Sequence, residues 1–282
     1  ALLNAQPMGF WSPHSLVQDA RRHGVVVLSP DINASTAGAT LEPHTESAGG
    51  FALRLGISSV RGIGDELAKA IAAARPFTSM EDLVRRVPQL NLTQIETLAT
   101  SGAYTQCFEI SRRDALWSAG AVIQSRPDRL MGVTTGSDSP QLPGMQPVEQ
   151  SICDLWSTGI SIDGHPTQFV RSQLSKLGVI TANELPKVES GSRIFVGGVI
   201  THRQRPSTSR GVTFFSLEDE TGLINVIVSQ GCFKRFRYVA MNASALLVRG
   251  KIESSQGVVN IIADHLSELK IDARGVGSRN FR

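Results

Sequence analysis

The sequence predicts an α+β protein, built from a helical domain, a linker and a small five-stranded barrel. Three observations predict this class. Apolar residues recur at helical spacing through residues 51–126, Pro, Gly, Ser and Thr dominate residues 127–150, and strand-like alternation runs through residues 191–270. Hydrophobic residues make up 41% of the 282 residues and charged residues 19%, which suits packed cores and excludes a disordered chain.

Composition excludes several other classes. No apolar run approaches the roughly 18 residues of a membrane span, and residues 1–7 lack the charged leader and apolar stretch of a signal peptide. Cys107, Cys153 and Cys232 are odd in number and far apart, which is typical of a reducing cytoplasm. The net charge of +3 excludes a polycation but permits local basic patches. Because no initiator Met is present, we expect the chain to begin within a longer protein.

The first fifty residues predict one helix, one strand and a loop. Ser12 suits the N-cap of a helix, Pro13 suits its first position, and Gly24 ends it. Residues 25–28 then predict a strand. Residues 34–50 are rich in Ser, Thr, Ala and Gly, and we expect them to form a surface loop.

Residues 51–126 predict a compact helical domain. A short strand is expected at residues 51–55, and an Ala-rich helix ends near Ala74. Capping residues precede three further predicted helices: Thr78 with Glu81, then Asn91, and then Ser111 with Asp114.

The sequence Gly62-Ile63-Gly64 lies between the predicted strand at residues 51–55 and the Ala-rich helix. This pattern is typical of a helix-hairpin-helix motif. The two glycines let the chain turn where a Cβ would clash. The amides that enter the second helix then point outward and can hold a DNA phosphate at the positive end of the helix dipole. Arg61 and Lys69 are expected to add charge-assisted contacts to the phosphate.

A second interpretation of the hairpin stays open. Asp65 and Glu66 occupy the first turn of the helix, where they satisfy its dipole and repel a phosphate. On this interpretation the hairpin is kept for packing alone, because a motif is only a hypothesis until its surroundings are known.

Residues 127–150 are expected to form the linker, and residues 151–190 a helical connector with a turn at residues 163–166. The barrel follows in residues 191–270, and residues 271–282 form a tail. Three strands, a helix and two strands are the order of an OB-fold, a Greek-key barrel that binds oligonucleotides. The expected strands are residues 193–202, 211–217, 223–228, 245–252 and 258–263, with the helix at residues 232–240.

The predicted loop between the first two barrel strands, residues 201–210, contains three arginines and no acidic residue. Arg203, Arg205 and Arg210 therefore lie where OB-folds contact a nucleic-acid backbone. We expect this loop to bind phosphates, although arginines that are merely solvated remain an alternative.

Aromatic and basic residues on the strands extend this site. Phe214 and Phe215 are adjacent, so alternation places one of them in the core and the other on the outer face, where it can stack on a base. Which of the two faces outward is left open, and Phe214 is taken as the candidate. Lys251 and Arg249 on the fourth strand are expected to support the same groove, unless both Phe side chains simply pack.

Catalysis has no candidate residues in this sequence. The six histidines are scattered, and none has the spacing of a metal ligand with a Cys or an acidic cluster. Glu218-Asp219-Glu220 is the one dense acidic run, and we expect solvated turn residues there rather than a metal site. No catalytic residue is therefore expected, and no metal bound by this chain.

Several stretches together resemble the bacterial C-family DNA polymerases, in collinear order over nearly the whole chain. Residues 197–206 and 217–222 are similar to the OB domain of the error-prone branch. The other matching stretches, which resemble the end of the fingers, the helix-hairpin-helix region and a Gly-His-Pro element, are residues 6–10, 53–57, 60–64, 76–83, 98–104 and 164–167.

The resemblance implies the C-terminal part of a damage-induced translesion polymerase, DNA polymerase III alpha subunit-like, with residues 1–50 as the end of the fingers. It implies nucleotidyl transfer with Mg²⁺ in a parent enzyme whose palm carboxylates lie upstream, so that this chain alone is inactive. The implied partners are single-stranded template and primer-template duplex DNA, and the implied location is the cytoplasm.

The resemblance also bears on recruitment. Replicative members carry a clamp-binding peptide, a Gln with spaced apolar residues and a terminal aromatic, whereas residues 141–145 here are Gln-Leu-Pro-Gly-Met. Gly144 and Met145 replace the large anchors, so we expect weak or no direct binding to the sliding clamp. The error-prone branch implies two accessory partners instead, a catalytically inert Y-family-like protein and a RecA-like protein.

Two alternatives from other classes remain. In the first alternative, the chain is a stand-alone single-stranded-DNA-binding or repair scaffold protein. The second, suggested by residues 217–222 alone, is an OB anticodon-binding module. The hairpin argues against the second alternative, and the truncated first segment argues against the first.

Overall fold

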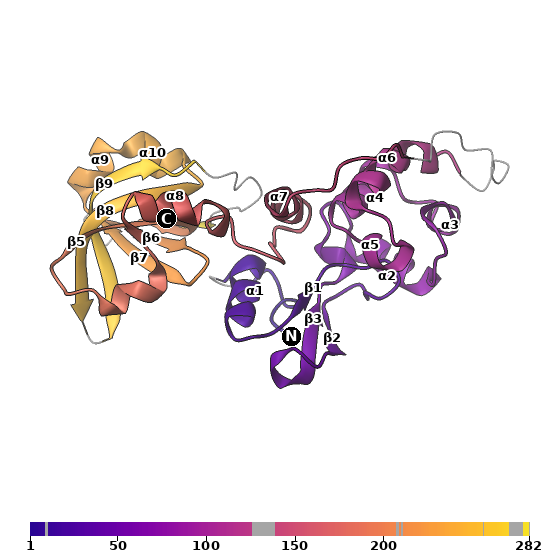
Figure 1. The fold of residues 1–282 in the computed structure, drawn as a ribbon, viewed down its shortest axis with the longest axis horizontal. Helices are drawn as coiled ribbons and strands as arrows, with labels where there is room; N and C mark the ends of the chain where they lie inside the picture. The colour runs from indigo at the N-terminus through magenta and orange to yellow at the C-terminus, as the bar shows by residue number, and fades with distance from the viewer. Residues whose placement is uncertain are drawn as a thin grey trace. The chain divides into compact units, whose positions relative to one another are not determined.

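A computed structural model describes residues 1–8, 11–125, 139–206, 209, 211–255, 257–270 and 279–281 (Figure 1). The chain divides into two compact units, each treated by itself. The first unit comprises Ala1–Gln6 and Leu16–Ile162, and the second comprises Pro7–Ser15 and Asp163–Arg282. Half of the predicted linker, residues 127–138, and most of the predicted tail lie outside the described residues.

The first unit contains a small sheet with the strand order β1-β3-β2. Strand β3 pairs in parallel with β1 and antiparallel with β2, and the strands are Val27–Leu28 (β1), Thr40–Pro43 (β2) and Phe51–Arg54 (β3). The predicted loop at residues 34–50 was therefore wrong, because β2 lies within it. Glu42 on β2 forms an ion pair with Arg54 on β3, whose side chain is 7% exposed, and this long-range pair leaves no trace in local composition.

Helices make up the rest of the first unit. They surround one apolar core in which Ile71, Leu83, Ile95, Leu98 and Tyr104 are fully buried. Helix α1, Pro13–Arg22, begins in the second unit and continues into the first. The others are Asp65–Ala74 (α2), Met80–Arg86 (α3), Leu92–Thr100 (α4), Thr105–Phe108 (α5), Arg112–Val122 (α6) and Pro147–Thr158 (α7), with 3-10 turns at Ala48–Gly50 (η1) and Ile57–Ser59 (η2).

Helix starts follow three of the four predicted caps. Ser12 accepts the amide of Ser15 at 3.1 Å at the start of α1, which begins at Pro13 as predicted. Asn91 accepts the amide of Gln94 at 2.9 Å, and Ser111 caps α6 as predicted. The predicted cap at Thr78 was wrong, because Ser79 caps α3 by accepting the amide of Asp82 at 3.1 Å. Helix α7 begins at Pro147, inside the residues predicted as linker.

The second unit is a closed five-stranded barrel in which β5 pairs with both β6 and β8 (Figure 1). The neighbour order β5-β6-β7-β9-β8 confirms the predicted OB-fold, and α9 and α10 lie between β7 and β8 in the chain as predicted. The strands are Arg193–Gln204 (β5), Thr213–Glu218 (β6), Leu223–Val228 (β7), Ala245–Ser255 (β8) and Val258–Glu268 (β9), and the helices Gln230–Arg235 (α9) and Arg237–Asn242 (α10).

Further elements of the second unit extend the barrel. Strands β4, Val179–Ile180, and β10, Arg279–Phe281, each pair in parallel with β5. The remaining elements are helix α8, Arg171–Lys176, and the 3-10 segments Gln168–Val170 (η3) and Ala182–Lys187 (η4).

Alternation along the strands divides the barrel residues between its core and its outer face. Phe215 and Leu217 of β6 are buried in the core, and Phe214 is 38% exposed on the outer face. The outward-facing residue of the Phe pair is therefore Phe214. Strands β5 and β6 approach closely at Gly198, where an added Cβ would lie 2.7 Å from the carbonyl oxygen of Glu218.

Candidate nucleic-acid interface

The hairpin of the first unit turns at Gly62, whose φ of +80° lies in the left-handed region that favours glycine. At Gly62 a Cβ would clash with the adjacent backbone, as its left-handed φ requires, although no atom beyond its chain neighbours lies within 4 Å. At Gly64 the predicted steric clash was wrong, because an added Cβ meets nothing within 4 Å. Gly64 has an ordinary φ of −75° and is the N-cap of α2, with no side-chain capping bond. The hairpin therefore needs glycine for backbone conformation at Gly62, and Gly64 leaves the first amides of α2 without a side-chain cap.

The side chains of the hairpin divide into exposed and buried ones. Arg61 is exposed and its guanidinium carbon lies 5.1 Å from the centroid of the Trp156 ring. Lys69 is also exposed, but its ammonium donates to Glu66 at 2.9 Å. Ile63 is 4% exposed and packs into the core of the first unit. Of these three predicted contact residues, Arg61 presents its charge outward, Lys69 is paired locally, and Ile63 supports the turn.

On the second unit, strand register places four outer-face side chains in one row. Phe214 on β6 pairs with Ile227 on β7, Ile227 pairs with Ile262 on β9, and Ile262 pairs with Lys251 on β8. The two isoleucines are half-buried, while Phe214 and Lys251 are exposed. Directly paired residues on one face have Cβ atoms about 4.5–5.5 Å apart, so the row is a continuous apolar strip with a cation at one end. We call these four residues the barrel row.

The three loop arginines occupy different environments. Strand β5 extends to Gln204, so Arg203 lies in the strand rather than in the predicted loop. Arg203 is 9% exposed, donates to the Ala243 carbonyl at 3.1 Å and lies over the Phe215 ring, and burial lowers its pKa. Arg205 is exposed, with its guanidinium carbon 4.8 Å from the centroid of the Phe233 ring. Arg210 lies outside the described residues.

Arg249 has a different environment from Lys251 on the same strand. Its Nε donates to Asp264 at 2.7 Å, and Arg193 donates to the same carboxylate at 2.9 Å. Lys251 pairs in register with Arg193 and forms no ion pair among the residues that the structure describes. Lys251 therefore presents a positive charge at one end of the barrel row, whereas the charge of Arg249 is offset.

The acidic run at the end of β6 is not solvated, and that expectation was wrong. Glu218 and Asp219 are completely buried. Asp219 accepts the amides of Thr221 and Gly222, at 2.7 and 2.9 Å, and so closes the turn internally. Burial raises the pKa of Asp219, and the hydrogen bonds it accepts act in the opposite direction. The sequence could not show this, because the groups that surround the run come from distant segments.

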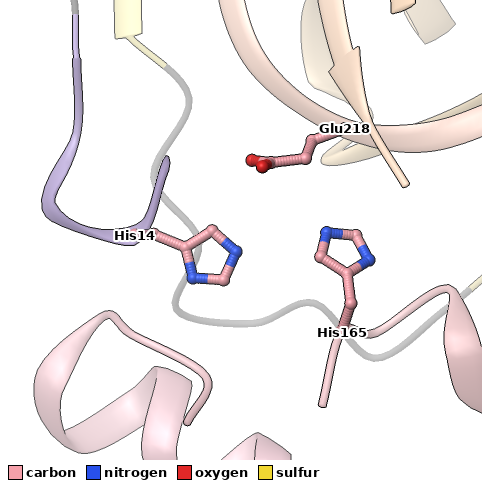
Figure 2. Close-up of side chains that lie close together, drawn as sticks. All are labelled: His14, His165 and Glu218. Carbon is pink, nitrogen blue, oxygen red and sulfur yellow. The ribbon is translucent and has the colours of Figure 1, made fainter. Parts of the chain in front are cut away.

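Two histidines and Glu218 come together within the second unit, although their spacing along the chain predicted no metal site. His14, His165 and Glu218 are 3%, 2% and 0% exposed. Each offers one ligand atom, and these atoms all lie within 4.8 Å of one another. Figure 2 shows that the three side chains converge from three separate segments.

The peptide that resembles a degenerate clamp motif, residues 141–145, forms an irregular segment before α7. Its Gln141, Pro143 and Gly144 are exposed, and Leu142 and Met145 are half-buried. The carbonyl of Pro143 accepts a hydrogen bond from Arg113 of α6 at 3.0 Å. The carbonyl of Met145 accepts a second hydrogen bond, from Gln150 of α7 at 3.4 Å, so the segment is held against its own unit at both positions.

Within the described part of the chain, no helix has the length and apolar character needed to cross a membrane.

Two family models match the chain, one in each half. A helix-hairpin-helix motif matches residues 24–115, and an OB-fold nucleic acid binding domain matches residues 194–269. The fold and these two matches define the class of the protein: it combines a helix-hairpin-helix region with a nucleic-acid-binding OB-fold.

Curated relatives match along the entire chain. An error-prone DNA polymerase from Mycolicibacterium paratuberculosis is 51% identical over 286 residues, and those from Mycobacterium tuberculosis H37Rv and Corynebacterium glutamicum are 50% and 43% identical. The match covers 100% of this chain and 25–26% of each relative. Among solved structures, asparaginyl-tRNA synthetase from Pyrococcus horikoshii is 17% identical, with a TM-score of 0.28, over 32% of this chain and 22% of that chain.

The chain is similar along its whole length to a segment of error-prone DNA polymerases, and it spans about a quarter of the length of the relatives it matches. The resemblance seen in the sequence is thereby confirmed at the level of the family.

Proposed function

We propose that this chain is the C-terminal DNA-binding and partner-docking portion of an error-prone DNA polymerase that acts in damage-induced translesion synthesis and mutagenesis. The observation that carries the proposal is the collinear match, at about half identity, of both nucleic-acid-binding modules to polymerases of that name. The alternative of a stand-alone scaffold is not favoured by any contact in the structure.

In this proposal the chemistry and the DNA contacts belong to different parts of the parent enzyme. Nucleotidyl transfer needs acidic residues that hold Mg²⁺ and place the attacking and leaving oxygens. We assign those residues to the part of the parent polymerase that this chain does not match. The chain contributes affinity for DNA and so keeps a damaged template near the active site while insertion is slow.

The barrel row is the proposed contact for single-stranded template. Phe214 offers an exposed ring on which a base can stack, and aromatic stacking of this kind is worth about 1–3 kcal/mol per base. Ile227 and Ile262 extend the apolar strip, and Lys251 lies at its end. In this proposal Lys251 and the exposed Arg205 bind the flanking phosphates. Stacking tolerates any base, which suits a template whose sequence and lesions vary.

The hairpin at Gly62 is the proposed contact for the duplex. The first amides of α2 have no side-chain cap, and the positive end of the helix dipole attracts a phosphate. Arg61 adds an exposed positive charge beside them. Asp65 and Glu66 oppose an anion at this end, so we expect the hairpin contact to be weaker than the barrel contact.

The remaining parts of the proposal concern partners and location. The same resemblance supports a cytoplasmic enzyme recruited by a catalytically inert Y-family-like protein and a RecA-like protein. Direct clamp binding is proposed to be weak or absent, because residues 141–145 lack large anchors.

The experiment for the barrel row compares two phenylalanines of equal exposure. Phe214 is 38% exposed on β6, and Phe195 is 36% exposed on β5, outside the row. Phe214→Ala is expected to weaken binding of a fluorescent single-stranded oligonucleotide by about 5- to 100-fold, the equivalent of one stacked base. Phe195→Ala serves as the matched control and is expected to bind like the parent chain. Equal affinities of all three proteins would refute the assignment.

A further inference from the structure

The second unit brings three metal-ligating side chains together at one buried point. His14 lies near the start of α1, His165 lies in the turn before η3, and Glu218 ends β6. The rings of His14 and His165 have centroids 5.9 Å apart, and the carboxylate of Glu218 is directed toward them (Figure 2). This cluster is separate from the barrel row, and the proposed DNA contacts do not use it.

The hydrogen bonds around His165 fix which of its ring nitrogens can bind a metal. The Thr167 hydroxyl donates to Glu220 at 2.5 Å, and a carboxylate can only accept, so this hydroxyl cannot also donate to His165. Nδ1 of His165 lies 2.7 Å from the same hydroxyl oxygen and must therefore be the donor. The Thr167 amide lies 3.3 Å from Nδ1 and would suit the other tautomer, but the contact to the hydroxyl is much shorter.

This arrangement leaves a lone pair on Nε2 of His165. A metal-binding histidine usually donates its other ring N–H to a hydrogen-bond acceptor, which fixes the tautomer and orients the ring. Thr167, itself held by Glu220, has that relationship to His165. The surroundings of the ring therefore match those of a metal ligand.

The donor set selects the metal. Two imidazole nitrogens and one carboxylate oxygen are ligands that zinc accepts, with bonds of about 2.0–2.2 Å and a fourth position open to a further ligand. Ligand atoms around tetrahedral zinc lie about 3.4 Å apart, and the three ligand atoms here already lie within 4.8 Å of one another, so only small side-chain movements are needed to close the site. A divalent ion would also stabilise the ionised form of Glu218, whose side chain is completely buried.

We propose that His14, His165 and Glu218 bind one divalent transition-metal ion, Zn²⁺ by preference. The ion would link the short Pro7–Ser15 segment to the barrel, because His14 belongs to that segment and Glu218 to β6. Trp11 of the same segment packs edge-on against His202 of β5, with centroids 6.1 Å apart, so the segment already lies on the barrel. Metal binding then makes the anchoring of this segment depend on zinc.

The experiment uses the 282-residue chain without an affinity tag, stripped with a chelator and titrated with Zn²⁺ against a competing indicator. We expect one equivalent to bind and the melting temperature to rise, as for any ligand that binds only the folded state. Co²⁺ in place of Zn²⁺ is expected to give visible absorption bands of a low-symmetry site. Absence of stoichiometric binding by the parent chain would overturn the proposal without recourse to any variant.

Variants then assign the ligands. His14→Ala, His165→Ala and Glu218→Gln are each expected to lower the zinc affinity at least 100-fold and to abolish the thermal shift. Thr167→Val removes the hydrogen bond to His165 together with the two that the same hydroxyl makes to Glu220, and it is expected to cost about 10- to 100-fold in affinity, with recovery in Thr167→Ser. His23→Ala removes an exposed imidazole of α1 and is the matched control. Binding that survives in all the ligand variants, with circular dichroism unchanged, would contradict the assignment.

Discussion

Arg171 forms a two-pronged ion pair with Glu220: its Nη2 donates to one carboxylate oxygen at 2.9 Å, and its Nε donates to the other. Arg171 lies on α8, and Glu220 lies in the turn between β6 and β7, so the pair ties the helical connector to the barrel. Asp219 lies 3.5 Å from the same guanidinium. One arginine therefore organises the acidic turn that the sequence suggested was solvated.

This ion pair predicts an acid-sensitive contribution to stability. Burial alone would raise the pKa of Glu220, but the hydrogen bonds from Arg171 and Thr167 outweigh it and hold the pKa below its ordinary value of 4.5. A carboxyl group with a lowered folded-state pKa contributes stability above its unfolded-state pKa and loses it as the pH falls through the folded-state value. Glu220→Gln is therefore expected to cost about 2 kcal/mol near pH 7.

The measurement for this prediction is urea unfolding of the parent chain and of Glu220→Gln between pH 7 and pH 3. The difference in the free energy of unfolding is expected to shrink progressively once the pH falls below about 4.5. Asp219 titrates in both proteins, so its opposite contribution largely cancels in the difference. A difference that stays constant down to pH 3 would contradict the ionic role of Glu220.

Sequence periodicity was enough to predict the barrel but not its buried polar groups. Each strand of the barrel carries its own alternation, as Phe214 and Phe215 illustrate, and the helix between β7 and β8 interrupts it at one place. His14 and His165, by contrast, are 151 residues apart in the chain. Only the fold brings them together, so no local spacing rule could find the cluster.

The barrel row was predicted only in part, because some of its residues come together only through the fold. Phe214 and Lys251 were singled out by residue type, whereas Ile227 and Ile262 join the barrel row only through strand register. Arg203 was predicted to lie in a loop, because polar residues continue strand β5 and the sequence therefore does not show where the strand ends. In the hairpin, both glycines were expected to be needed for the turn, and the structure shows a left-handed backbone at Gly62 but not at Gly64.

The two hairpin glycines are predicted to respond differently to substitution. Gly62→Ala places a Cβ on a left-handed backbone and is expected to cost about 1–2 kcal/mol in the free energy of unfolding. Gly64→Ser places a capping hydroxyl at the start of α2 and is expected to raise stability by a few tenths of a kcal/mol. Because that hydroxyl competes for the amides, Gly64→Ser is also expected to weaken duplex binding. Stronger or unchanged duplex binding by Gly64→Ser would show that these amides do not contact phosphate.

Arg203 and Arg205 lie two residues apart, and their substitutions are expected to affect different properties: stability for Arg203 and DNA binding for Arg205. Arg205→Ala removes an exposed charge and is expected to lower the slope of log affinity against log salt for single-stranded DNA by about 0.7. Arg203→Ala is expected to leave the slope unchanged and to cost about 1–3 kcal/mol of stability, because the Ala243 carbonyl loses a buried donor. Salt titrations and chemical unfolding of both variants separate the two roles. A fall in slope for Arg203→Ala alone would reverse the assignment.

The chain is predicted to have no polymerase activity by itself. Nucleotidyl transfer on two metal ions needs carboxylates that face a shared open site. The one dense acidic run of this sequence, Glu218-Asp219-Glu220, is instead buried, engaged in closing a turn or bonded to Arg171. Primer extension by the purified chain with Mg²⁺ and all four nucleotides is the measurement. Extension above the level of a mock purification would show that catalytic residues have been overlooked.

The final prediction concerns direct binding to the sliding clamp through residues 141–145. Gly144 offers no side chain and Met145 no aromatic ring, and a hot-spot anchor of this kind contributes about 2 kcal/mol or more. The hydrogen bond from Arg113 to the Pro143 carbonyl further opposes an extended peptide leaving its own unit. The parent chain is therefore expected to show no measurable clamp binding in a calorimetric titration. The double variant Gly144→Leu, Met145→Phe restores both anchors and is expected to bind measurably, more tightly still when Arg113→Ala releases the peptide. Tight binding by the parent chain that persists after deletion of residues 141–145 would show that another surface binds the clamp.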